Sequence, residues 1–399
     1  MFLLIFDDWE QRKLSDVADI IGGGTPNTNN EEYWNGDIDW YSPAEIGEQR
    51  YVNGSRKKIT MLGLQKSSAK NLPVGTVLFT SRAGIGNTAI LKKGGATNQG
   101  FQSILPKENQ LDTYFIYSKT DELKRYGEVT GAGSTFIEVS GKQMAKMPIS
   151  IPSFEEQFRI GSFFKKLDDT IALHQEKLEK LKQLKRAYLQ VIFPQKGERT
   201  PRLRFANFSQ DWEQGELKEL ASFSKGLGYT KSDLVEKGTS IILYGRLYTK
   251  YQTVIEDVDT YVTIKEKSVL SKGGEVIVPS SGESSEDIAR ASVVAKAGIL
   301  IGGDLNIIKT ENSINPIFLA LNISHGKQQQ ELRKRAQGKS VVHLHNSDLK
   351  KVNLIYPMLE EQIQIGRFFN QLDDNIAFQS DKVEKLKKLK EVYLSKMFT

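Results

Sequence analysis

The stretch that decides the fold occupies residues 151–193 and reads IPSFEEQFRIGSFFKKLDDTIALHQEKLEKLKQLKRAYLQVIF. It returns at residues 356–398 as YPMLEEQIQIGRFFNQLDDNIAFQSDKVEKLKKLKEVYLSKMF, with about half of its positions unchanged. Nearly the same shift relates Asp-Trp-Glu-Gln at 8–11 to its copy at 211–214. A period of about 200 residues is too long for a solenoid repeat, so it indicates two copies of one large module.

Each copy of this stretch carries apolar residues at alternating steps of four and three, the spacing of a coiled-coil seam. The first copy predicts a helix over residues 155–192, about 57 Å long at 1.5 Å per residue. Neither helix has an apolar partner of that length except the other, so we expect an antiparallel coiled coil with pseudo-two-fold symmetry. The predicted pairing residues are Phe164, Leu167, Ile171, Leu178 and Leu181, with their copies Phe369, Leu372, Ile376, Val383 and Leu386.

Two details of the seam are separate predictions. After Leu181 and Leu386 the apolar pattern takes a second step of three, to Leu184 and Leu389, so the seam is expected to continue through these leucines. His174 and its counterpart Gln379 occupy matching seam positions. A polar seam residue often fixes the register of a coiled coil, and a merely solvated position is an equally good interpretation.

Between the repeated stretches the two halves diverge, so each half is a variable block followed by a nearly constant one. This pattern favours a shared scaffold with two different specificities over a drifted duplication. Both variable blocks mix short strands, helices and glycine-containing loops, which indicates an α+β fold. The expected domains are a first variable domain (1–150), a helical spacer (151–195), a linker (196–209), a second variable domain (210–355) and a second spacer (356–399).

Composition limits the class of protein. Of the 399 residues 39% are hydrophobic and 26% are charged, which is enough apolar material for sizeable cores. The net charge of +6 does not by itself establish a nucleic-acid partner. The absence of cysteine excludes disulfides, thiolate zinc sites and a cysteine nucleophile, and it is compatible with the cytoplasm. No apolar run is long enough to span a bilayer, and the opening MFLLIF is too short for a signal peptide.

Polar side chains on glycine-rich loops are the candidate DNA-binding residues, because amides, hydroxyls and arginines bond to base edges and phosphates. Plain turns and solvated charged loops are the alternative interpretation. The candidates of the first block are Thr25, Asn27, Ser81, Arg82, Asn98, Gln99 and Ser134. Those of the second block are Arg246, Tyr248, Lys250, Ser280, Ser281, Arg333, Arg335, Gln337, Lys339 and Ser340.

Signals for catalysis are poor, and we predict no catalytic or metal-binding residue. Gly338-Lys339-Ser340 ends like a phosphate-binding loop, but Arg333 stands where the required first glycine should be. Asn315-Pro316-Ile317-Phe318 is similar to an amino-methyltransferase motif, although a helix that starts at proline is the favoured interpretation. His343 and His345 alternate on a strand and are more typical of a structural role than of a metal site.

The chain resembles the specificity subunit of type I restriction-modification enzymes. The resemblance rests on the Asp-Trp-Glu-Gln entry to each half, on residues 24–40 and on residues 152–169 with their copy at 357–374. It implies two target-recognition domains, each followed by a helical spacer, that read the two halves of a split double-stranded DNA target. It also implies no catalysis and no cofactor in this chain: modification subunits would methylate adenine N6 with S-adenosylmethionine, and restriction subunits would use ATP and Mg²⁺.

The resemblance is incomplete at the start of the chain. Residues 200–208 lead into the second half, whereas the first half has only residues 1–6 before Asp7, which suggests a shortened or recombined start. Two other functions remain open at this point. They are a self-contained adenine-N6 DNA methyltransferase, suggested by the motif at Asn315, and a coiled-coil scaffold that binds no DNA.

Overall fold

The computed structural model describes residues 9–47, 49–82, 84–131, 138–195, 197–336 and 342–398. The chain divides into two compact units. Unit 1 comprises residues 1–173 and 383–399, and unit 2 comprises residues 174–382. Each unit therefore contains one variable block and a part of each of the two long helices, α6 (Phe154–Val191) and α13 (Leu359–Phe398).

Unit 1 is built on a five-stranded sheet of order β2-β9-β6-β7-β4, beside a three-stranded sheet of order β5-β3-β8 and the pair β1-β10. Its strands are β1 (Glu10–Lys13), β2 (Ala18–Gly22), β3 (Trp34–Tyr41), β4 (Tyr51–Val52), β5 (Lys57–Ile59), β6 (Val77–Phe79), β7 (Thr88–Leu91), β8 (Gly95–Thr97), β9 (Gln102–Pro106) and β10 (Pro148–Ile151). Its shorter helices are α1 (Leu14–Val17), α2 (Met61–Gln65), α3 (Thr113–Ser118), α4 (Thr120–Gly131) and α5 (Gly141–Ala145).

Unit 2 has two five-stranded sheets, of order β12-β22-β18-β20-β15 and β13-β16-β14-β21-β17, and the pairs β11-β24 and β19-β23. Its strands are β11 (Glu213–Glu216), β12 (Ala221–Lys225), β13 (Leu234–Val235), β14 (Thr239–Ile242), β15 (Val254–Ile255), β16 (Tyr261–Val262), β17 (Leu270–Lys272), β18 (Glu275–Pro279), β19 (Ser281–Gly282), β20 (Ser292–Val294), β21 (Ala297–Ile301), β22 (Leu305–Thr310), β23 (Val342–His343) and β24 (Asn353–Tyr356). Its shorter helices are α7 (Leu217–Leu220), α8 (Arg246–Thr249), α9 (Ser285–Ile288), α10 (Pro316–His325), α11 (Lys327–Arg335) and α12 (Asn346–Leu349).

The two variable blocks share one topology although their sequences differ. In both five-stranded sheets that carry the equivalent strands, the first four strands pair antiparallel and the fifth joins the edge in parallel. The trio β5-β3-β8 likewise matches β16-β14-β21, with one antiparallel and one parallel pairing each. The predicted α+β fold is confirmed, and it is the same fold twice.

The repeated Glu-Glu-Gln explains how each long helix begins against its own variable block. Gln157 is buried, accepts a hydrogen bond from the backbone of Asp112 (3.0 Å) and donates to the carbonyls of Gln110 and Pro152. Gln362 repeats this arrangement with the backbone of Asn315 (2.9 Å). Asp112 and Asn315 are the N-caps of α3 and α10, so one amide holds a helix start to the spacer in each unit.

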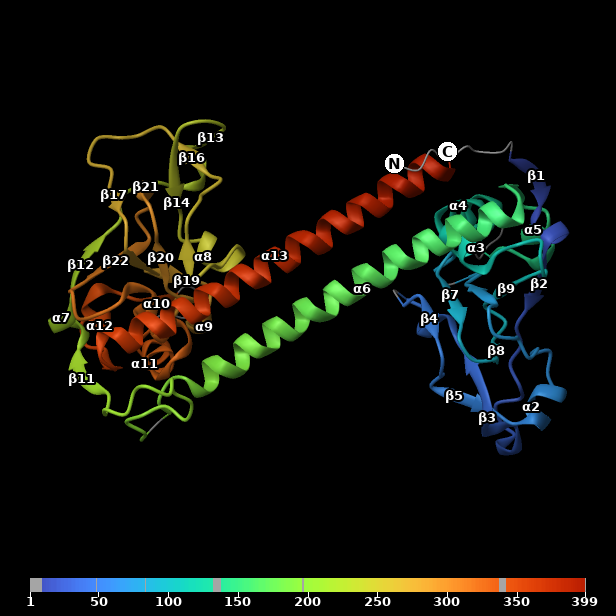
Figure 1. Cartoon of the computed structure of the whole chain (residues 1–399), viewed down its shortest axis with the longest axis horizontal. Helices are drawn as coiled ribbons and strands as arrows, with labels where there is room; N and C mark the ends of the chain where they lie inside the picture. Colours follow the sequence, from blue (N-terminus) through green and yellow to red (C-terminus); the bar gives the residue numbers. More distant parts are fainter. Residues whose placement is uncertain are drawn as a thin grey trace. The chain divides into compact units, whose positions relative to one another are not determined.

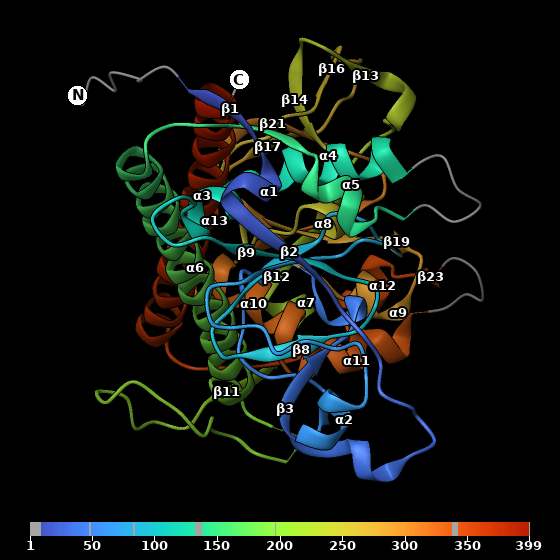
Figure 2. The same ribbon diagram turned by 90° about the vertical axis from the view of Figure 1, so that its right-hand side faces the viewer.

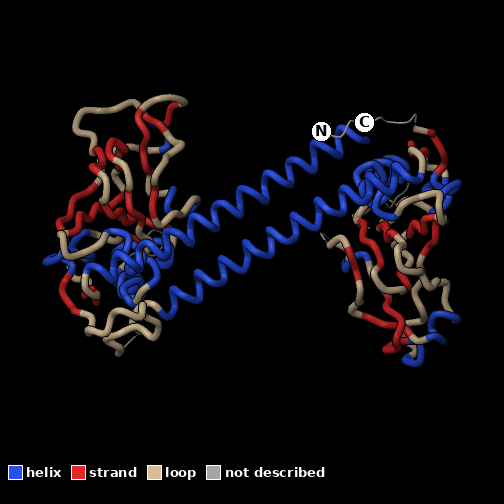
Figure 3. Tube along the Cα trace, viewed as in Figure 1, coloured by secondary structure: helices blue, strands red, loops and turns tan. Residues whose placement is uncertain are grey.

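The long helices run antiparallel within each unit. In unit 1 the ring of Phe163 meets that of Tyr393, and Phe164 stacks on Phe398. In Figure 1 the last turns of α13, in red, accordingly lie beside the first turns of α6, in green. In unit 2 Tyr188 meets Phe368. Figure 3 shows the described parts of α6 and α13 as helix throughout.

A phenylalanine at the end of α13, and one just after the end of α6, completes the core of the block that belongs to the other half of the sequence. Phe398 packs against Trp9 and Phe115 in unit 1. At equivalent positions in unit 2, Phe193 and Trp212 pack against Phe318. Each core therefore closes only when chain from both halves is present.

All of the predicted pairing residues are buried or half-buried. α6 begins and ends within one residue of the predicted bounds, and Phe164, Ile171, Leu178, Phe369, Leu372 and Val383 are buried. Leu167, Leu181, Ile376 and Leu386 are half-buried. His174 Nδ1 lies 2.8 Å from Gln379 Oε1, so the two polar seam residues bond to each other. The pseudo-two-fold relation between the units stays a prediction.

The prediction that the seam passes through Leu184 and Leu389 is wrong. Both leucines are exposed, at 44% and 43%. The helices instead turn Lys185 and Lys390 inward, where each ammonium pairs with an aspartate of the other helix. A step of four after Leu181 and Leu386 keeps the ordinary heptad spacing, and the ion pair supplies the partner that a lysine needs there.

Candidate nucleic-acid interface

Four segments of unit 1 meet at one end of its sheet and form loop cluster 1, defined as residues 22–27, 80–82, 97–100 and 138–140. Backbone hydrogen bonds hold them together. Gly24 N donates to Thr97 O (2.8 Å), Ser81 N donates to Gly100 O (2.8 Å), and Val139 N donates to Ser81 O (3.0 Å). A Cβ on Gly23 would lie 1.8 Å from Asn98 O, so only glycine permits this approach.

Loop cluster 1 contains six of the predicted DNA-binding residues, and four of them present polar groups near one another. The hydroxyl of Thr25 donates to the side-chain oxygen of Gln99. Arg82 and Glu138 are partly exposed and their charged groups are 4.0 Å apart. Asn98 accepts a hydrogen bond from Gly100 N (2.8 Å). Amide, hydroxyl, guanidinium and carboxylate groups therefore meet on one small surface, which is the side-chain chemistry that reads base edges.

The other candidates of the first block behave differently. Ser81 is fully buried, and its hydroxyl bonds to none of the residues that the structure describes, so it supports the loop from inside. Asn27 is exposed and its side chain accepts from Asn29 N (3.0 Å) in a local turn. Ser134 lies outside the described residues.

Unit 2 repeats the same backbone frame as loop cluster 2, defined as residues 225–228, 279–281, 301–304 and 343–345. Leu227 N donates to Ile301 O (3.1 Å), Ser280 N donates to Asp304 O (2.8 Å), and Leu344 N donates to Ser280 O (3.0 Å). A Cβ on Gly226 would lie 2.0 Å from Gly302 O, the counterpart of the contact at Gly23. The two clusters thus have one frame in common.

The side chains on the second frame are not those on the first. Ser281 stands where unit 1 has Arg82, and its hydroxyl lies 3.3 Å from Nδ1 of His343, which stands where unit 1 has Glu138. The His343 and His345 rings stack 6.2 Å apart, and Tyr248 donates to Ser281 O (2.7 Å). Ser280 is buried like its counterpart Ser81.

Sequence reasoning missed His343 and His345 as parts of this surface. It weighed them only as structural residues or metal ligands, and no group of three or more metal-binding side chains occurs in the described part of the chain. The signal that could have found them is the register of the repeat. The offset of 205 residues that relates Glu155 to Glu360 also places Glu138 on His343.

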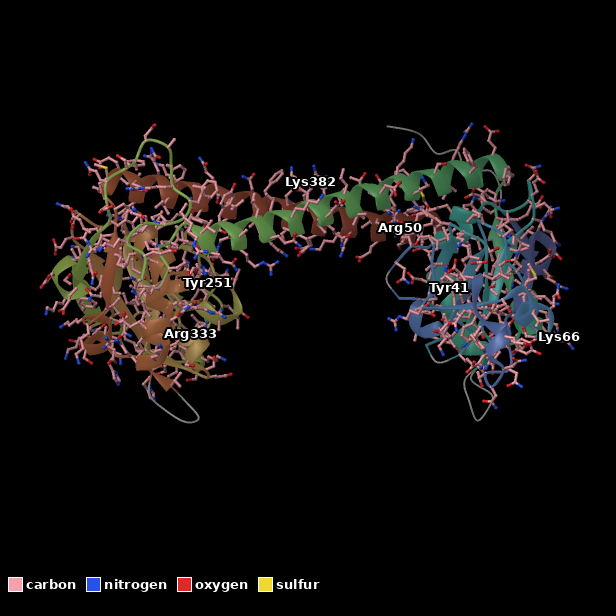
Figure 4. All side chains as sticks on the ribbon, turned by 90° about the horizontal axis from the view of Figure 1, so that it is seen from below. Tyr41, Arg50, Lys66, Tyr251, Arg333 and Lys382 are labelled. Carbon is pink, nitrogen blue, oxygen red and sulfur yellow. The ribbon has the colours of Figure 1, made fainter. Side chains whose placement is uncertain are left out.

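A basic helix end lies beside loop cluster 2. α11 ends in Arg333, Lys334 and Arg335, and it packs against α9, which in turn touches β19 and β23. Arg335 pairs with Glu331 (2.6 Å), while Arg333 Nε is buried and has no hydrogen-bond partner among the described residues. Figures 2 and 4 place β19, β23 and Arg333 on the side of unit 2 that faces away from α13. Gln337, Lys339 and Ser340 lie outside the described residues.

Arg246 and Lys250 are already engaged within unit 2. Arg246 bonds to Asp259 (2.7 Å), to Gln252 (2.9 Å) and to the carbonyl of Asp257. Lys250 pairs with the other oxygen of Asp259 (2.8 Å), and this hydrogen bond, with those of the Asp259 backbone and of Arg246, lowers the pKa of Asp259 to about 2. These two cations hold the loop at 252–259, so they are weaker candidates for base contacts than the residues of loop cluster 2.

Asn315 is used structurally. Its side chain accepts hydrogen bonds from the backbones of Ile317 (3.0 Å) and Phe318 (3.1 Å), as the N-cap of α10. The interpretation of this motif as a helix start is confirmed. Among the described residues, no helix combines the length and the apolar character that crossing a bilayer requires.

Comparison with known proteins agrees with this doubled arrangement. A family model described as "Type I restriction modification DNA specificity domain" matches twice, over residues 6–183 and 209–388. The specificity subunit of the type I restriction enzyme MjaIX from Methanocaldococcus jannaschii is 39% identical over 167 residues, which cover 41% of this chain and 39% of that protein. The EcoR124I/EcoR124II specificity subunit from Escherichia coli is 30% identical over 167 residues, covering 40% of this chain and 41% of that protein.

These two matches span about two fifths of the relatives' length. A longer match links the chain to the putative MjaX specificity subunit of M. jannaschii, 23% identical over 98% of this chain and 93% of that protein. Among solved structures, the S subunit of a type I restriction-modification system from M. genitalium has the same fold, with a TM-score of 0.62 at 14% identity. That match covers 100% of this chain and 98% of the other.

Proposed function

Since this chain belongs to the type I restriction-modification DNA specificity family, we propose that it is the subunit that recognises DNA sequence in a type I restriction-modification complex. The observation that carries the proposal is the shared frame of loop clusters 1 and 2, which bear different side chains. One frame with two sets of base-reading groups suits a target made of two different halves, and the long helices suit a fixed gap between them.

The roles of the partners follow from the same proposal. The chain itself performs no catalysis and needs no cofactor. Two modification subunits, docked on the exposed flanks of α6 and α13, methylate adenine N6 with S-adenosylmethionine. Restriction subunits supply ATP- and Mg²⁺-dependent translocation and cleavage. All of these subunits act on the same double-stranded DNA, in the cytoplasm. A self-contained methyltransferase finds little support, because the side chain of Asn315 is occupied as a helix cap.

A methylome tests the proposal. The chain is expressed with the modification subunit of its own genome in a host without DNA methylation, and N6-methyladenine is mapped by single-molecule sequencing. We expect one split motif, with two short defined halves around a fixed gap. Absence of new methylation, with both subunits shown to be soluble and associated, would contradict the proposal.

A further inference from the structure

One aspartate in each long helix binds a lysine of the other long helix. In unit 1, Asp168 of α6 lies 2.7 Å from Lys390 of α13, with only 8% of the aspartate side chain exposed. In unit 2, Asp373 of α13 pairs in the same way with Lys185 of α6. Both aspartates belong to the repeated Leu-Asp-Asp, so the repeat provides the same ion pair twice.

The second oxygen of each carboxylate binds the recognition domain. Tyr114 Oη donates to Asp168 Oδ2 (2.8 Å), and Thr253 Oγ1 donates to Asp373 Oδ2 (2.9 Å). Each aspartate thus joins three chain segments: its own helix, the opposite helix and the recognition domain. We call the set of Asp168, Lys390 and Tyr114 junction 1, and the set of Asp373, Lys185 and Thr253 junction 2.

Both junctions are reached from the same place in the fold, the residue that precedes the parallel edge strand of the sheet. That residue is Thr253 before β15 and Arg50 before β4. Arg50 donates to Tyr114 Oη (3.1 Å) and to Asp169 Oδ1 (2.8 Å), so it ties the strand to Tyr114 of junction 1 and to the residue of α6 that follows Asp168. In Figure 4 Arg50 lies where the recognition domain of unit 1 meets the long helices.

Such a junction is better suited to orienting the recognition domain than to stabilising the fold. Burying an ion pair carries a desolvation cost that often cancels the Coulomb attraction, so it is weak evidence for stability. Its hydrogen bonds are directional, whereas the aromatic contacts of Phe164 and Phe369 tolerate small rotations. A directional contact at the sheet edge, one turn along the helix from these rings, resists rotation of the domain about the helix pair.

We propose that junctions 1 and 2 fix the angle of each recognition domain on its helix pair, and thereby set which gap length the protein accepts. This inference rests on the proposed function. Asp168, Asp373, Lys185 and Lys390 are positioning residues in this scheme, and none of them needs to touch DNA. Junction 1 carries the additional bonds of Arg50, so we expect it to hold its domain more tightly than junction 2 does.

The test measures gap discrimination by the full chain together with its modification subunit. DNA probes carry both half-sites unchanged, with the native gap or with one base pair more or fewer. Asp373→Asn and Lys185→Met should each lower the ratio of affinities for the native and altered gaps by about fivefold, the size of a typical coupling between contacting residues. Lys185→Arg keeps the charge and should restore discrimination. Asp374→Asn, at the exposed neighbouring position, is the matched control.

The double variant Asp373→Asn with Lys185→Met keeps the test sharp if a single variant folds poorly, because it leaves no unpaired charge. The inference is overturned if the wild type discriminates between gaps and the variants discriminate equally well. It is also overturned if affinity falls by the same factor for every gap, which is the mark of a merely structural role. A wild type that prefers no split target at all would instead contradict the proposed function.

Discussion

At the scale of single residues, the two loop clusters differ where recognition needs them to differ. The buried serines, Ser81 and Ser280, occupy the same place in both frames, whereas their partly exposed neighbours Arg82 and Ser281 differ in charge and length. Buried positions that only support a loop can stay constant while exposed ones change. Specificity can therefore change without a change of fold.

Substitutions in one loop cluster should affect one half-site only. Arg82→Ala or Gln99→Ala should reduce base discrimination in the half-site bound by unit 1. Ser281→Ala or His343→Ala should reduce it in the half-site bound by unit 2. A good base contact contributes about 1–3 kcal/mol of discrimination, so the loss should be about fivefold or more at one base pair. Methylome mapping of each variant measures it. A change in both half-sites from one substitution would show that the domains do not read independently.

The glycines of the repeated Ile-Gly should differ sharply in their tolerance of alanine. A Cβ on Gly161 would lie 2.3 Å from Asp112 Oδ1 and 2.9 Å from Phe115 N, whereas the nearest atom to a Cβ on Gly366 is Asn315 Oδ1 at 3.2 Å. Gly161→Ala should therefore cost about 2 kcal/mol or more through overpacking. Gly366→Ala should cost little, because helix propensity gains up to about 1 kcal/mol. Urea unfolding compares the two variants, and equal losses would contradict the close packing at Asp112.

Asp39 should make unit 1 sensitive to acid. Burial alone would raise the pKa of this carboxyl, but hydrogen bonds from Ser55 and the pairing with Lys93 (3.0 Å) bring the pKa below its usual 3.8. Because folding lowers this pKa, the carboxylate stabilises the fold above about pH 4, and this stabilisation is lost as pH falls through the lower folded value. In the Asp39→Asn variant, the free energy of unfolding should fall less steeply than in the wild type as the pH is lowered below about 4.

Tryptophan fluorescence measures this effect, because the ring of Trp40 lies next to Asp39 in the chain and packs against Trp34. Asp37→Asn, which changes the exposed aspartate two residues earlier in β3, is the control. If the pH dependence of stability is the same in Asp39→Asn and in the wild type, other carboxyl groups cause it.

At the scale of elements, local and non-local structure differ in how far the sequence predicts them. The heptad spacing predicts α6 to within one residue, because the helical period depends only on residues that are close together in the sequence. The same spacing misplaced Leu184, because an ion pair with Asp373, far away in the sequence, outweighed a leucine at that step. The sheet order was not predicted at all, since pairings such as β2 with β9 join segments about 80 residues apart.

The candidate site shows the same division. Residue chemistry found Thr25, Arg82, Asn98 and Gln99, which the structure brings together. It also chose Arg246, whose guanidinium is already bonded inside unit 2. Nothing in a sequence distinguishes an arginine that pairs with a nearby aspartate from one that is available for DNA.

The polar pair of His174 and Gln379 should contribute to a unique register of the two helices more than to their stability. His174→Leu or Gln379→Leu alone leaves one buried polar group without its partner and should cost about 1–3 kcal/mol. The double leucine variant should be as stable as the wild type or slightly more so, because both polar groups are gone. Thermal unfolding distinguishes these outcomes. A double variant that loses the sum of the two single losses would show that the pair stabilises the helices directly.

At the scale of the whole molecule, the length of the helix pair should set the distance between half-sites. One heptad added to α6 between Leu173 and His174, and one added to α13 between Lys382 and Val383, lengthen both helices where the two units divide. Seven residues add about 10 Å, which is about three base pairs of DNA. Methylome mapping should show unchanged half-sites around a gap about three base pairs longer. A heptad added to α6 alone should instead disrupt pairing, because α13 would no longer match it.

The exchange of helix ends between the halves has a consequence for synthesis on the ribosome. Trp9 and Phe115 emerge early, but the aromatic ring that covers them belongs to Phe398 at the end of α13. The core of unit 1 therefore stays incomplete until Phe398 has been translated. Exposed apolar surface during this delay invites aggregation and chaperone binding. Closing a loop of such length also makes the final docking of α13 a slow, late step in maturation.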